Sequence, residues 1–367
     1  MMTMTAAVLR STGGPFTFEE LQLEGPRPDE VMVGLSSTGL CHTDLAVVQG
    51  TMPAPTPIVL GHEGAGTVME VGAAVRDLSV GDEVAMSFAS CGHCRNCLTG
   101  REAYCAIFER LNFGGAREDG STTLSTSDGL VVHGSFFGQS SFASHAVVAA
   151  RNVVRLPAGP GGIDLDLAGP MGCGFQTGAG AIINSLRVTA GDTVVISGAG
   201  AVGLSALMAA KAVGATTIIV VDVLESRLRL ARDLGASHTL DGRQSSMVQH
   251  IQDLTHGGAD YALDTSGVAE VITRDVESVR NGGTIALVGT GDGLPALRVP
   301  TIAGKTIRYL IEGDSVPRVF IPQLIALHEL GSFPVDRLVT RYPFAEIDQA
   351  LADTRSGVAV KAVLTFD

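Results

Sequence analysis

The pattern of hydrophobic and polar positions changes part-way along the chain. In the first 150 residues, short β-rich runs at 31–35, 66–72 and 144–157 are separated by glycine and proline, which predicts a domain of mostly antiparallel strands. From about residue 175, near-continuous Val/Ile runs alternate with helical stretches. That alternation predicts a parallel sheet covered by helices on both faces, and therefore an α/β fold class.

The second half shows this alternation segment by segment. We expect strands at 193–197, 216–222, 261–267 and 282–289, and helices at 201–213, 226–234 and 268–279. The alternation fades after about residue 305, and the run AVKAVLTFD at 359–367 predicts a strand that returns to the first domain. We therefore predict a nucleotide-binding domain at 175–305, inserted into a catalytic domain formed by 1–174 and 306–367.

Composition fits an ordinary globular chain of about two domains, with 367 residues of which 45% are hydrophobic and 17% charged. Lys and Arg number 25 and Asp and Glu 38, and the resulting net charge of -13 disfavours nucleic acids and anionic membranes as partners. There is no signal-peptide pattern and no run of 18 apolar residues. With six cysteines spaced as metal ligands rather than disulfides, we expect a protein of the reducing cytoplasm.

A glycine-rich motif follows the first strand of the predicted parallel sheet. Gly198 permits a tight turn, Gly200 lets a pyrophosphate approach the backbone, and Gly203 allows the helix to pack closely on the strand. The alternative is a βα turn shaped by packing alone, but the strand-turn-helix setting favours a dinucleotide site. The candidate contacts in this loop are Gly198, Gly200, Ala201, Val202 and Gly203.

Asp222 ends the second strand, 19 residues after Gly203. Its carboxylate can accept hydrogen bonds from both ribose hydroxyls of the adenosine and repels a 2′-phosphate, so the cofactor is predicted to be NAD rather than NADP. Arg227 weakens this preference, because a nearby cation can tolerate a phosphate. Thr265 and Gly289, at later strand ends, are candidates for the nicotinamide side of the site.

Four cysteines form the pattern C-x2-C-x2-C-x7-C at Cys91, Cys94, Cys97 and Cys105. Four thiolates close a tetrahedron around zinc, hold a loop and leave no position for substrate. The alternatives are an iron-sulfur cluster or redox-active thiols. The spacing matches neither common ferredoxin pattern, which favours a structural zinc.

The two remaining cysteines stand alone, Cys41 in GLCHTDLAV and Cys173 in GPMGCGFQTGAG, while His62 stands in GHEGAG. Together they make the Cys2His set of an open, catalytic zinc site. By themselves, a lone histidine and a lone cysteine are more often structural.

Five motifs occur in one order along the chain: CHTD at 41–44, GHExxGxxxxxG at 61–72, the four-cysteine loop, GCGxxTG at 172–178 and GAGAVG at 198–203. In this order they resemble the zinc-dependent medium-chain alcohol dehydrogenases, over essentially the whole chain. The resemblance implies a Rossmann-type NAD-binding domain inserted in a mainly β, GroES-like catalytic domain. It also implies two zinc ions per chain and a homodimer or homotetramer.

The resemblance assigns a role to each motif residue of the open site. It implies that Cys41, His62 and Cys173 bind the catalytic zinc and that the nearby Glu63 can exchange as a ligand. It implies that Asp44 orients the zinc-bound histidine and that Thr43 takes the proton from the zinc-bound alcohol. The zinc would act as a Lewis acid and NAD+ would accept the hydride.

Further family positions concern the cofactor and the proton. His42 and Lys361 match pyrophosphate contacts, with a surface cation as the alternative, and Thr177 matches a cofactor contact. Ala46 stands where many members have the histidine that ends a proton relay. We therefore expect alcohol oxidation to be more pH dependent than in relay-complete relatives, and an Ala46→His variant to change the pH profile.

Cys173 favours simple alcohols over sugars as substrates, since many polyol dehydrogenases have glutamate at this position. Segments 112–125, 133–148 and 311–334 resemble benzyl and geraniol-type alcohol dehydrogenases. The Gly- and Ser-rich stretch 112–141 is expected to be a surface insertion. An aromatic or allylic primary alcohol is therefore expected. The alternatives are a thiol-adduct formaldehyde dehydrogenase, a broad-range alcohol dehydrogenase and a non-catalytic NAD-binding module. Candidate pocket residues, with a core position as the alternative, are Met52, Phe88 and Phe142.

Overall fold

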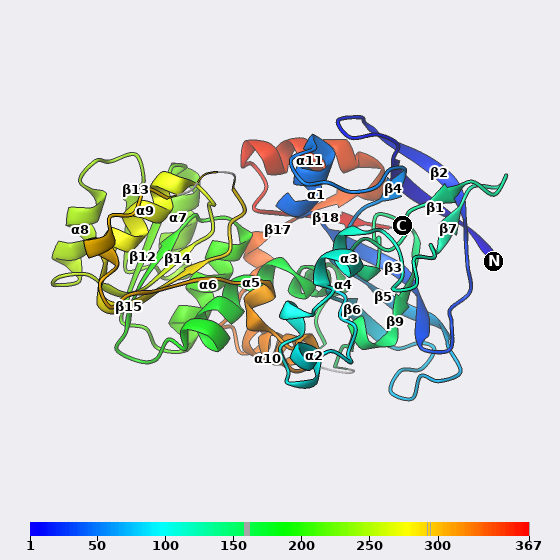
Figure 1. The fold of residues 1–367 in the computed structure, drawn as a ribbon, viewed down its shortest axis with the longest axis horizontal. Coiled ribbons are helices and arrows are strands. Elements are labelled where there is room, and N and C mark those ends of the chain that lie inside the picture. The colour runs from blue at the N-terminus through cyan, green and yellow to red at the C-terminus, as the bar shows by residue number, and fades with distance from the viewer. Residues whose placement is uncertain (158–161, 292, 294, 367) are drawn as a thin grey trace. The chain divides into compact units, whose positions relative to one another are not determined.

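The computed structural model describes residues 1–157, 162–291, 293 and 295–366. The chain forms two compact units. Unit 1 contains Met1–Cys173, Val316–Ile325 and Val335–Asp367, and unit 2 contains Gly174–Ser315 and Ala326–Pro334. Figure 1 shows the strands and helices of each unit. Among the described residues, no helix has the length and apolar character needed to cross a membrane.

Unit 1 is built mainly from two β-sheets. The first has the order β4-β1-β2-β7-β8 and its neighbouring strands are antiparallel. Its strands are β1 (Met2–Leu9), β2 (Phe16–Leu23), β4 (Ile58–Val59), β7 (Leu124–Ser125) and β8 (Val131–Val132). The predominantly antiparallel character predicted from the short β-rich runs is therefore confirmed.

The second sheet has the order β10-β6-β5-β3-β18-β17, with β9 also paired to β3. Strand β18 pairs antiparallel with β3, so the predicted return of the chain to the first domain is confirmed. Alternate residues of β3, namely Val31, Val33 and Leu35, are buried in one hydrophobic core together with Val68 of β5. The strands are β3 (Glu30–Gly39), β5 (Gly64–Val71), β6 (Glu83–Met86), β9 (His145–Ala149), β10 (Val153–Arg155), β17 (Val339–Pro343) and β18 (Lys361–Thr365).

The helices of unit 1 are short and lie between strands along the chain. Helix α1 begins directly after Cys41, where the backbone N–H of Cys41 donates to the Asp44 carboxylate at 3.0 Å, and it ends at Gly50 with a φ of 78°. The helices are α1 (His42–Gln49), α2 (Arg95–Leu98), α3 (Phe108–Phe113), α4 (Leu165–Ala168) and α11 (Ile347–Ser356). Helix α10 (Pro317–Glu329) follows the last strand of unit 2 in sequence.

Unit 2 contains one parallel sheet of six strands in the order β13-β12-β11-β14-β15-β16. This is the strand order of a doubly wound nucleotide-binding domain, so the predicted Rossmann-type architecture is confirmed. Its strands are β11 (Thr193–Ser197), β12 (Thr217–Asp222), β13 (His238–Asp241), β14 (Ala259–Asp264), β15 (Val279–Leu287) and β16 (Thr306–Tyr309). Its helices are α5 (Gly174–Gly180), α6 (Ala201–Ala212), α7 (Glu225–Leu234), α8 (Met247–Leu254) and α9 (Ala269–Ser278).

The predicted boundary at residue 305 differs from the structure. Strand β16 begins at Thr306 and pairs in parallel with β15, so it extends the sheet of unit 2 beyond that boundary. The residues after it, up to Ser315, also belong to unit 2, as do Ala326–Pro334. The prediction missed Thr306–Tyr309 because this strand is defined by its backbone pairing with β15. So short a run gives no signal of that pairing in the sequence.

Candidate active site and metal centres

The first metal-binding group contains the three predicted ligands and the neighbouring glutamate. One ligand atom from each of Cys41, His62, Glu63 and Cys173 lies within 4.8 Å of all the others. Cys41 caps helix α1, His62 and Glu63 precede strand β5, and Cys173 precedes helix α5. Nε2 of His62 is buried and has no hydrogen-bond partner of normal geometry. Two thiols and an imidazole nitrogen without such a partner are a donor set that fits zinc.

The charges around this group favour a bound metal. A hydrogen bond involving Cys173, together with His62, lowers the pKa of Cys41 well below its ordinary value of 9.0 although burial raises it. For His62, burial lowers the pKa, but the Asp44 carboxylate and Cys41 outweigh burial and raise the pKa well above its ordinary value of 6.5. A metal ion would take the place of the proton on Nε2 of His62 and bind the Cys41 thiolate, while the proton on Nδ1 stays with the Asp44 carboxylate.

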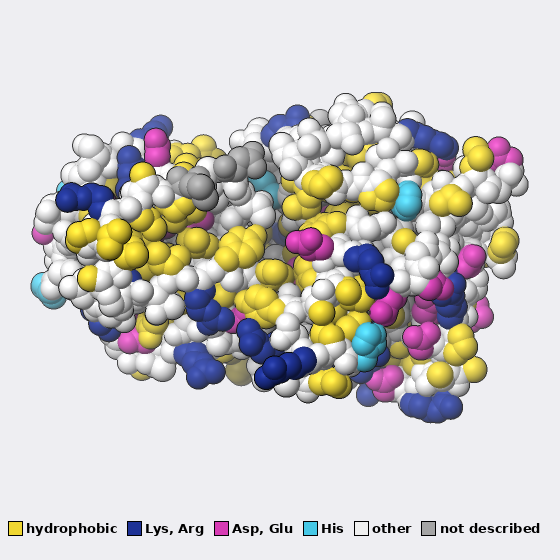
Figure 2. Space-filling view, in the orientation of Figure 1, with side chains coloured by type: hydrophobic (Ala, Val, Ile, Leu, Met, Phe, Trp, Pro, Cys, Tyr) yellow, Lys and Arg dark blue, Asp and Glu magenta, His cyan; other side chains and the backbone are white. Residues whose placement is uncertain are grey.

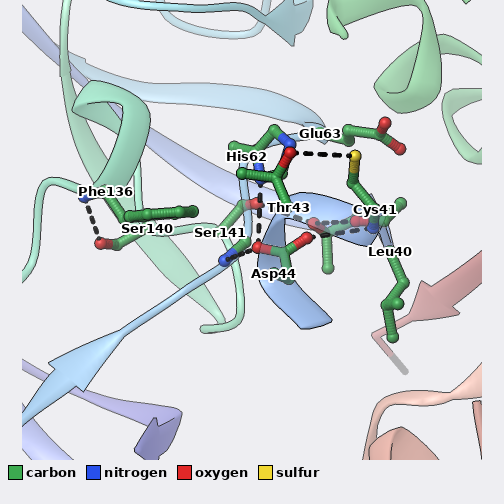
Figure 3. Close-up of polar contacts among 12 residues, drawn as sticks. Leu40, Cys41, Thr43, Asp44, His62, Glu63, Phe136, Ser140 and Ser141 are labelled. Carbon is green, nitrogen blue, oxygen red and sulfur yellow. Dashed lines mark hydrogen bonds and ion pairs between the residues drawn. The ribbon is translucent and has the colours of Figure 1, made fainter. Parts of the chain in front are cut away.

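Asp44 lies where it can orient His62. Its Oδ1 is 3.1 Å from Nδ1 of His62 and accepts the backbone N–H of Gly61 at 3.1 Å, while Oδ2 accepts the N–H of Cys41 (Figure 3). The carboxylate is fully buried. It therefore joins both predicted zinc-ligand segments and directs Nε2 of the histidine away from itself. Thr43 lies at the edge of the group, with Oγ1 at 3.7 Å from Sγ of Cys41 (Figure 3).

Glu63 forms a buried ion pair that the sequence does not reveal. Nζ of Lys361 donates to both carboxylate oxygens of Glu63 at 2.8 Å and to the carbonyl of Leu40 at 3.1 Å. The side chains are 3% and 0% exposed. Burial lowers the pKa of Lys361, but Glu63 outweighs this and raises it above its ordinary value. Lys361 therefore lies at the zinc-ligand group and not at the surface, and a pyrophosphate contact requires its ammonium to leave Glu63.

The second metal-binding group contains four cysteines of one loop. The Sγ atoms of Cys91, Cys94, Cys97 and Cys105 lie within 4.8 Å of one another. Backbone N–H groups of Cys94 and Cys91 donate to Sγ of Cys91 and of Cys105, each at 3.3 Å, although burial raises the pKa of Cys105 above its ordinary value. A hydrogen bond from the backbone of Ala106 lowers the pKa of Cys94 to about 6. Four sulfur atoms in this arrangement fit a closed, structural zinc site.

The glycine-rich loop of unit 2 has the geometry of a dinucleotide site. Gly198 has a φ of 98°, and a Cβ on Gly203 would lie 1.8 Å from the carbonyl oxygen of Gly198. By contrast, a Cβ on Gly200 would meet nothing within 4 Å, so the open side of the loop lies there. Helix α6 begins at Ala201 and includes Val202, and its N-terminal N–H groups can bind a phosphate.

Comparison with known proteins agrees with this arrangement of motifs. Residues 27–158 match the family model described as "Alcohol dehydrogenase GroES-like domain", and residues 201–320 match the one described as "Zinc-binding dehydrogenase". The geraniol dehydrogenase of Castellaniella defragrans is 46% identical over 371 residues, which cover 98% of this chain and 97% of that protein. The chain belongs to the zinc-dependent medium-chain alcohol dehydrogenases.

Two solved structures resemble this alcohol dehydrogenase over its full length. The alcohol dehydrogenase zinc-binding domain protein from Burkholderia ambifaria has a TM-score of 0.97 and 47% identity, covering 100% of this chain and 99% of that one. The benzyl alcohol dehydrogenase of Acinetobacter calcoaceticus has a TM-score of 0.96 and 42% identity, covering 100% of both chains.

Two of the predicted cofactor residues of unit 2, Asp222 and Thr265, contact the glycine-rich loop. Asp222 accepts the backbone N–H groups of Ala199 at 2.6 Å and Leu224 at 2.8 Å, so its carboxylate lies at the loop. Arg227 is buried, and burial lowers its pKa although Asp222 opposes this. Oγ1 of Thr265 donates to the carbonyls of Ser197 and Gly198 at 2.9 and 3.2 Å.

Two further predicted cofactor residues contact other parts of unit 2. Gly289 packs against the backbone of Gly267, where a Cβ would lie 2.2 Å from the amide nitrogen. Thr177 lies on α5, and its hydroxyl donates to the buried Glu312 carboxylate at 3.4 Å. Helix α5 packs tightly on α6, since a Cβ on Gly178 would lie 2.0 Å from the carbonyl oxygen of Val202.

The remaining predictions concern unit 1. His42 is an exposed residue of α1 and Met52 is half-buried. Phe142 is fully buried with its ring 5.9 Å from that of Phe16, and Phe88 is 3% exposed with its ring 5.9 Å from that of Phe108. Each of these two rings packs on another ring of unit 1, and a substrate-lining role for Phe88, Phe142 and Met52 stays a prediction.

The stretch 112–141 was expected to be a surface insertion, but part of it is buried in the structure. Its last part, including Phe136, Phe137, Gln139 and Ser140, is buried beside His62. Sequence reasoning missed these residues because glycine and serine dominate the stretch. The two adjacent phenylalanines were the only local signal of burial.

Proposed function

We propose that this alcohol dehydrogenase interconverts allylic or aryl primary alcohols and their aldehydes with NAD as the cofactor. The observation that carries the substrate class is the full-length similarity to proteins named geraniol dehydrogenase and benzyl alcohol dehydrogenase. The preference for NAD is supported by Asp222, whose carboxylate lies at the glycine-rich loop and would repel a 2′-phosphate.

The chemistry follows from the residues of the two units. When bound, zinc makes the alcohol oxygen more acidic and the nicotinamide ring accepts the hydride. Cys41, His62 and Cys173 would hold the metal, and Asp44 keeps Nε2 of His62 directed toward it. Thr43, at the edge of this group, is the hydroxyl that takes the proton of the alcohol while passing its own proton on to water.

The test is a comparison of kcat/KM for geraniol, benzyl alcohol and ethanol, each with NAD+ and NADP+. We expect geraniol or benzyl alcohol to be the best substrate and NAD+ to be the better cofactor. Ethanol as the best substrate would refute the proposed substrate class. Turnover of formaldehyde only in the presence of an added thiol would indicate a thiol-adduct dehydrogenase instead.

A substitution at Asp222 tests the cofactor separately. Because the Asp222→Asn variant lacks the charge that repels a 2′-phosphate, we expect its affinity ratio for NAD+ over NADP+ to fall by about tenfold, measured by direct titration. The Asp253→Asn variant is the control, since Asp253 is an exposed residue of α8. An unchanged ratio in Asp222→Asn would refute the assignment.

We further propose that the enzyme is a homodimer or homotetramer of the cytoplasm. The oligomeric state is supported by β16, an edge strand of unit 2 on which Tyr309 is 51% exposed, and by Val299, which is 79% exposed. Figure 2 shows hydrophobic side chains gathered over the part of unit 2 where Figure 1 labels β12 and β14. The cytoplasmic location is supported by the six cysteines, none of which forms a disulfide. Light scattering of the purified protein measures the subunit number, and a monomer would contradict the first statement.

A further inference from the structure

Residues 135–142 run alongside the segment that carries His62. Backbone N–H groups of Ser141 and Phe142 donate to the carbonyls of Gly61 and Leu60, each at 2.9 Å. The hydroxyl of Ser140 donates to the carbonyl of Val59 at 2.6 Å, and Figure 3 shows Ser140 and Ser141 on the side of His62 opposite to Glu63. The three residues immediately before His62 are therefore fixed by this segment.

Gln139 fixes the chain on the other side of the histidine as well. Its Nε2 donates to the carbonyl of His62 at 2.9 Å, and its Oε1 accepts the N–H of Gly64 at 3.1 Å. The side chain is 1% exposed. Because one amide group both donates and accepts here, it holds the backbone around His62 and Glu63 in a single geometry.

Phe137 contacts the imidazole ring itself. The two rings are stacked with centroids 4.3 Å apart and an interplanar angle of 22°. Phe137 is 4% exposed and has a φ of 50°, in the left-handed region that a bulky residue rarely adopts. Such a conformation is unfavourable for a residue with a Cβ and persists only where the surroundings impose it. The strained backbone is thus associated with the placement of this ring on His62.

These contacts complete the restraint on the histidine. Asp44 fixes Nδ1, but a single hydrogen bond leaves the ring free to tilt about it. The ring of Phe137 restricts that tilt, and Gln139 fixes the backbone from which the imidazole extends. We propose that Phe137 and Gln139 are positioning residues, which hold Nε2 of His62 in the direction that binding of the catalytic zinc requires. This inference does not depend on the substrate or the cofactor.

The experiment follows zinc rather than turnover. The variants are Phe137→Leu, which keeps an apolar side chain without a ring, and Phe137→Gly, which also accepts the left-handed φ without strain. In both we expect one of the two zinc ions to pass to a chelator at least tenfold faster than in the wild type. With Co(II) in the catalytic site, we expect the visible absorption bands to shift. The zinc ion of the four-cysteine loop should be retained.

Phe113→Leu is the matched control. The ring of Phe113 lies 5.2 Å from that of Phe137 and 6.3 Å from that of Phe136, and among the described residues it makes no ring contact with His62. This variant removes an aromatic ring from the same cluster, so it should lower stability without changing zinc release. Equal acceleration in Phe113→Leu and Phe137→Leu would show a general packing effect and overturn the proposal.

Gln139 is tested in the same assay. Gln139→Met preserves length but makes no amide hydrogen bond, and Gln139→Glu keeps an acceptor for the N–H of Gly64 while losing the donor to His62. We expect faster release of the catalytic zinc in both, and the glutamate variant serves if the methionine variant does not fold. Wild-type release rates and Co(II) spectra in the variants of Phe137 and Gln139 would refute the inference.

Discussion

The buried pair of Lys361 and Glu63 allows a quantitative prediction about stability. In the Lys361→Met variant the Glu63 carboxyl loses its cation and three hydrogen bonds of the ammonium disappear. Burial already raises the pKa of Glu63 above its ordinary value of 4.5 while Lys361 opposes the rise. Without the lysine, burial and Cys41 raise the pKa of Glu63 and only His62 opposes them, so the folded variant holds the proton of this carboxyl more tightly than the wild type does.

The magnitude follows from the proton that the folded variant must retain. The unfolded chain releases this proton near pH 4.5, so the folded state binds more protons and its stability falls as pH rises. The cost is at most about 1.4 kcal/mol for each pH unit above 4.5, which amounts to about 3.4 kcal/mol at pH 7 and about 0.7 kcal/mol at pH 5. We therefore expect Lys361→Met to be much less stable than the wild type at pH 7 and only slightly less stable at pH 5.

The assay is urea unfolding in the presence of zinc at pH 5, 6 and 7. Far-UV circular dichroism suits it because the chain contains no tryptophan. Lys211→Met is the control, since Nζ of Lys211 donates to the carbonyl of Leu234 at 3.3 Å and its loss leaves no carboxylate without a cation. A double variant, Lys361→Met with Glu63→Gln, should regain most of the lost stability at pH 7. A loss of equal size at pH 5 and pH 7 would refute the reasoning.

Three further predictions concern other buried groups. Asp44→Asn should lower the affinity of the catalytic site for zinc by about 10- to 100-fold in a chelator competition, because the histidine loses its carboxylate partner. An unchanged affinity would contradict the role of Asp44. Cys97→Ser should leave one zinc ion per chain by elemental analysis and lower the thermal midpoint, because the four-cysteine loop then lacks a ligand; two retained ions would contradict that assignment. Burial raises the pKa of Asp275 well above 3.8, so the folded state keeps a proton and loses stability as pH rises above about 4. Asp275→Asn should therefore gain stability relative to the wild type as pH increases from 4 to 7, and a constant difference in unfolding free energy would refute this.

The parts of the site that sequence reasoning predicted are those with local signals. The four cysteines of the closed group lie within one loop, so their spacing alone indicates a metal. The glycine-rich loop lies between a Val/Ile strand and a helix, and the sequence shows all three. Cys173 was recognised from its motif, because no spacing relates it to Cys41 and His62.

The parts that sequence reasoning missed depend on contacts between distant segments. Lys361 is one cation on a returning strand, and its partner is 298 positions away. Gln139 lies in a polar stretch, yet both ends of its amide bond to the backbone of another segment. Strand β16 is four residues long and is defined by its pairing with β15. No local periodicity records such tertiary contacts.

The place of strand β18 has a consequence for the synthesis of the protein. Lys361, on this strand, reaches the Glu63 carboxylate only after about 300 further residues have been translated. At about 5–20 residues per second, that delay is roughly 15–60 s. During this time Cys41 and His62 have left the ribosome, but β3 lacks its neighbour and Glu63 lacks its cation. A nascent chain that stalls before β18 therefore already contains the ligands Cys41, His62 and Cys173, but it lacks the cation of Glu63 and the strand beside β3.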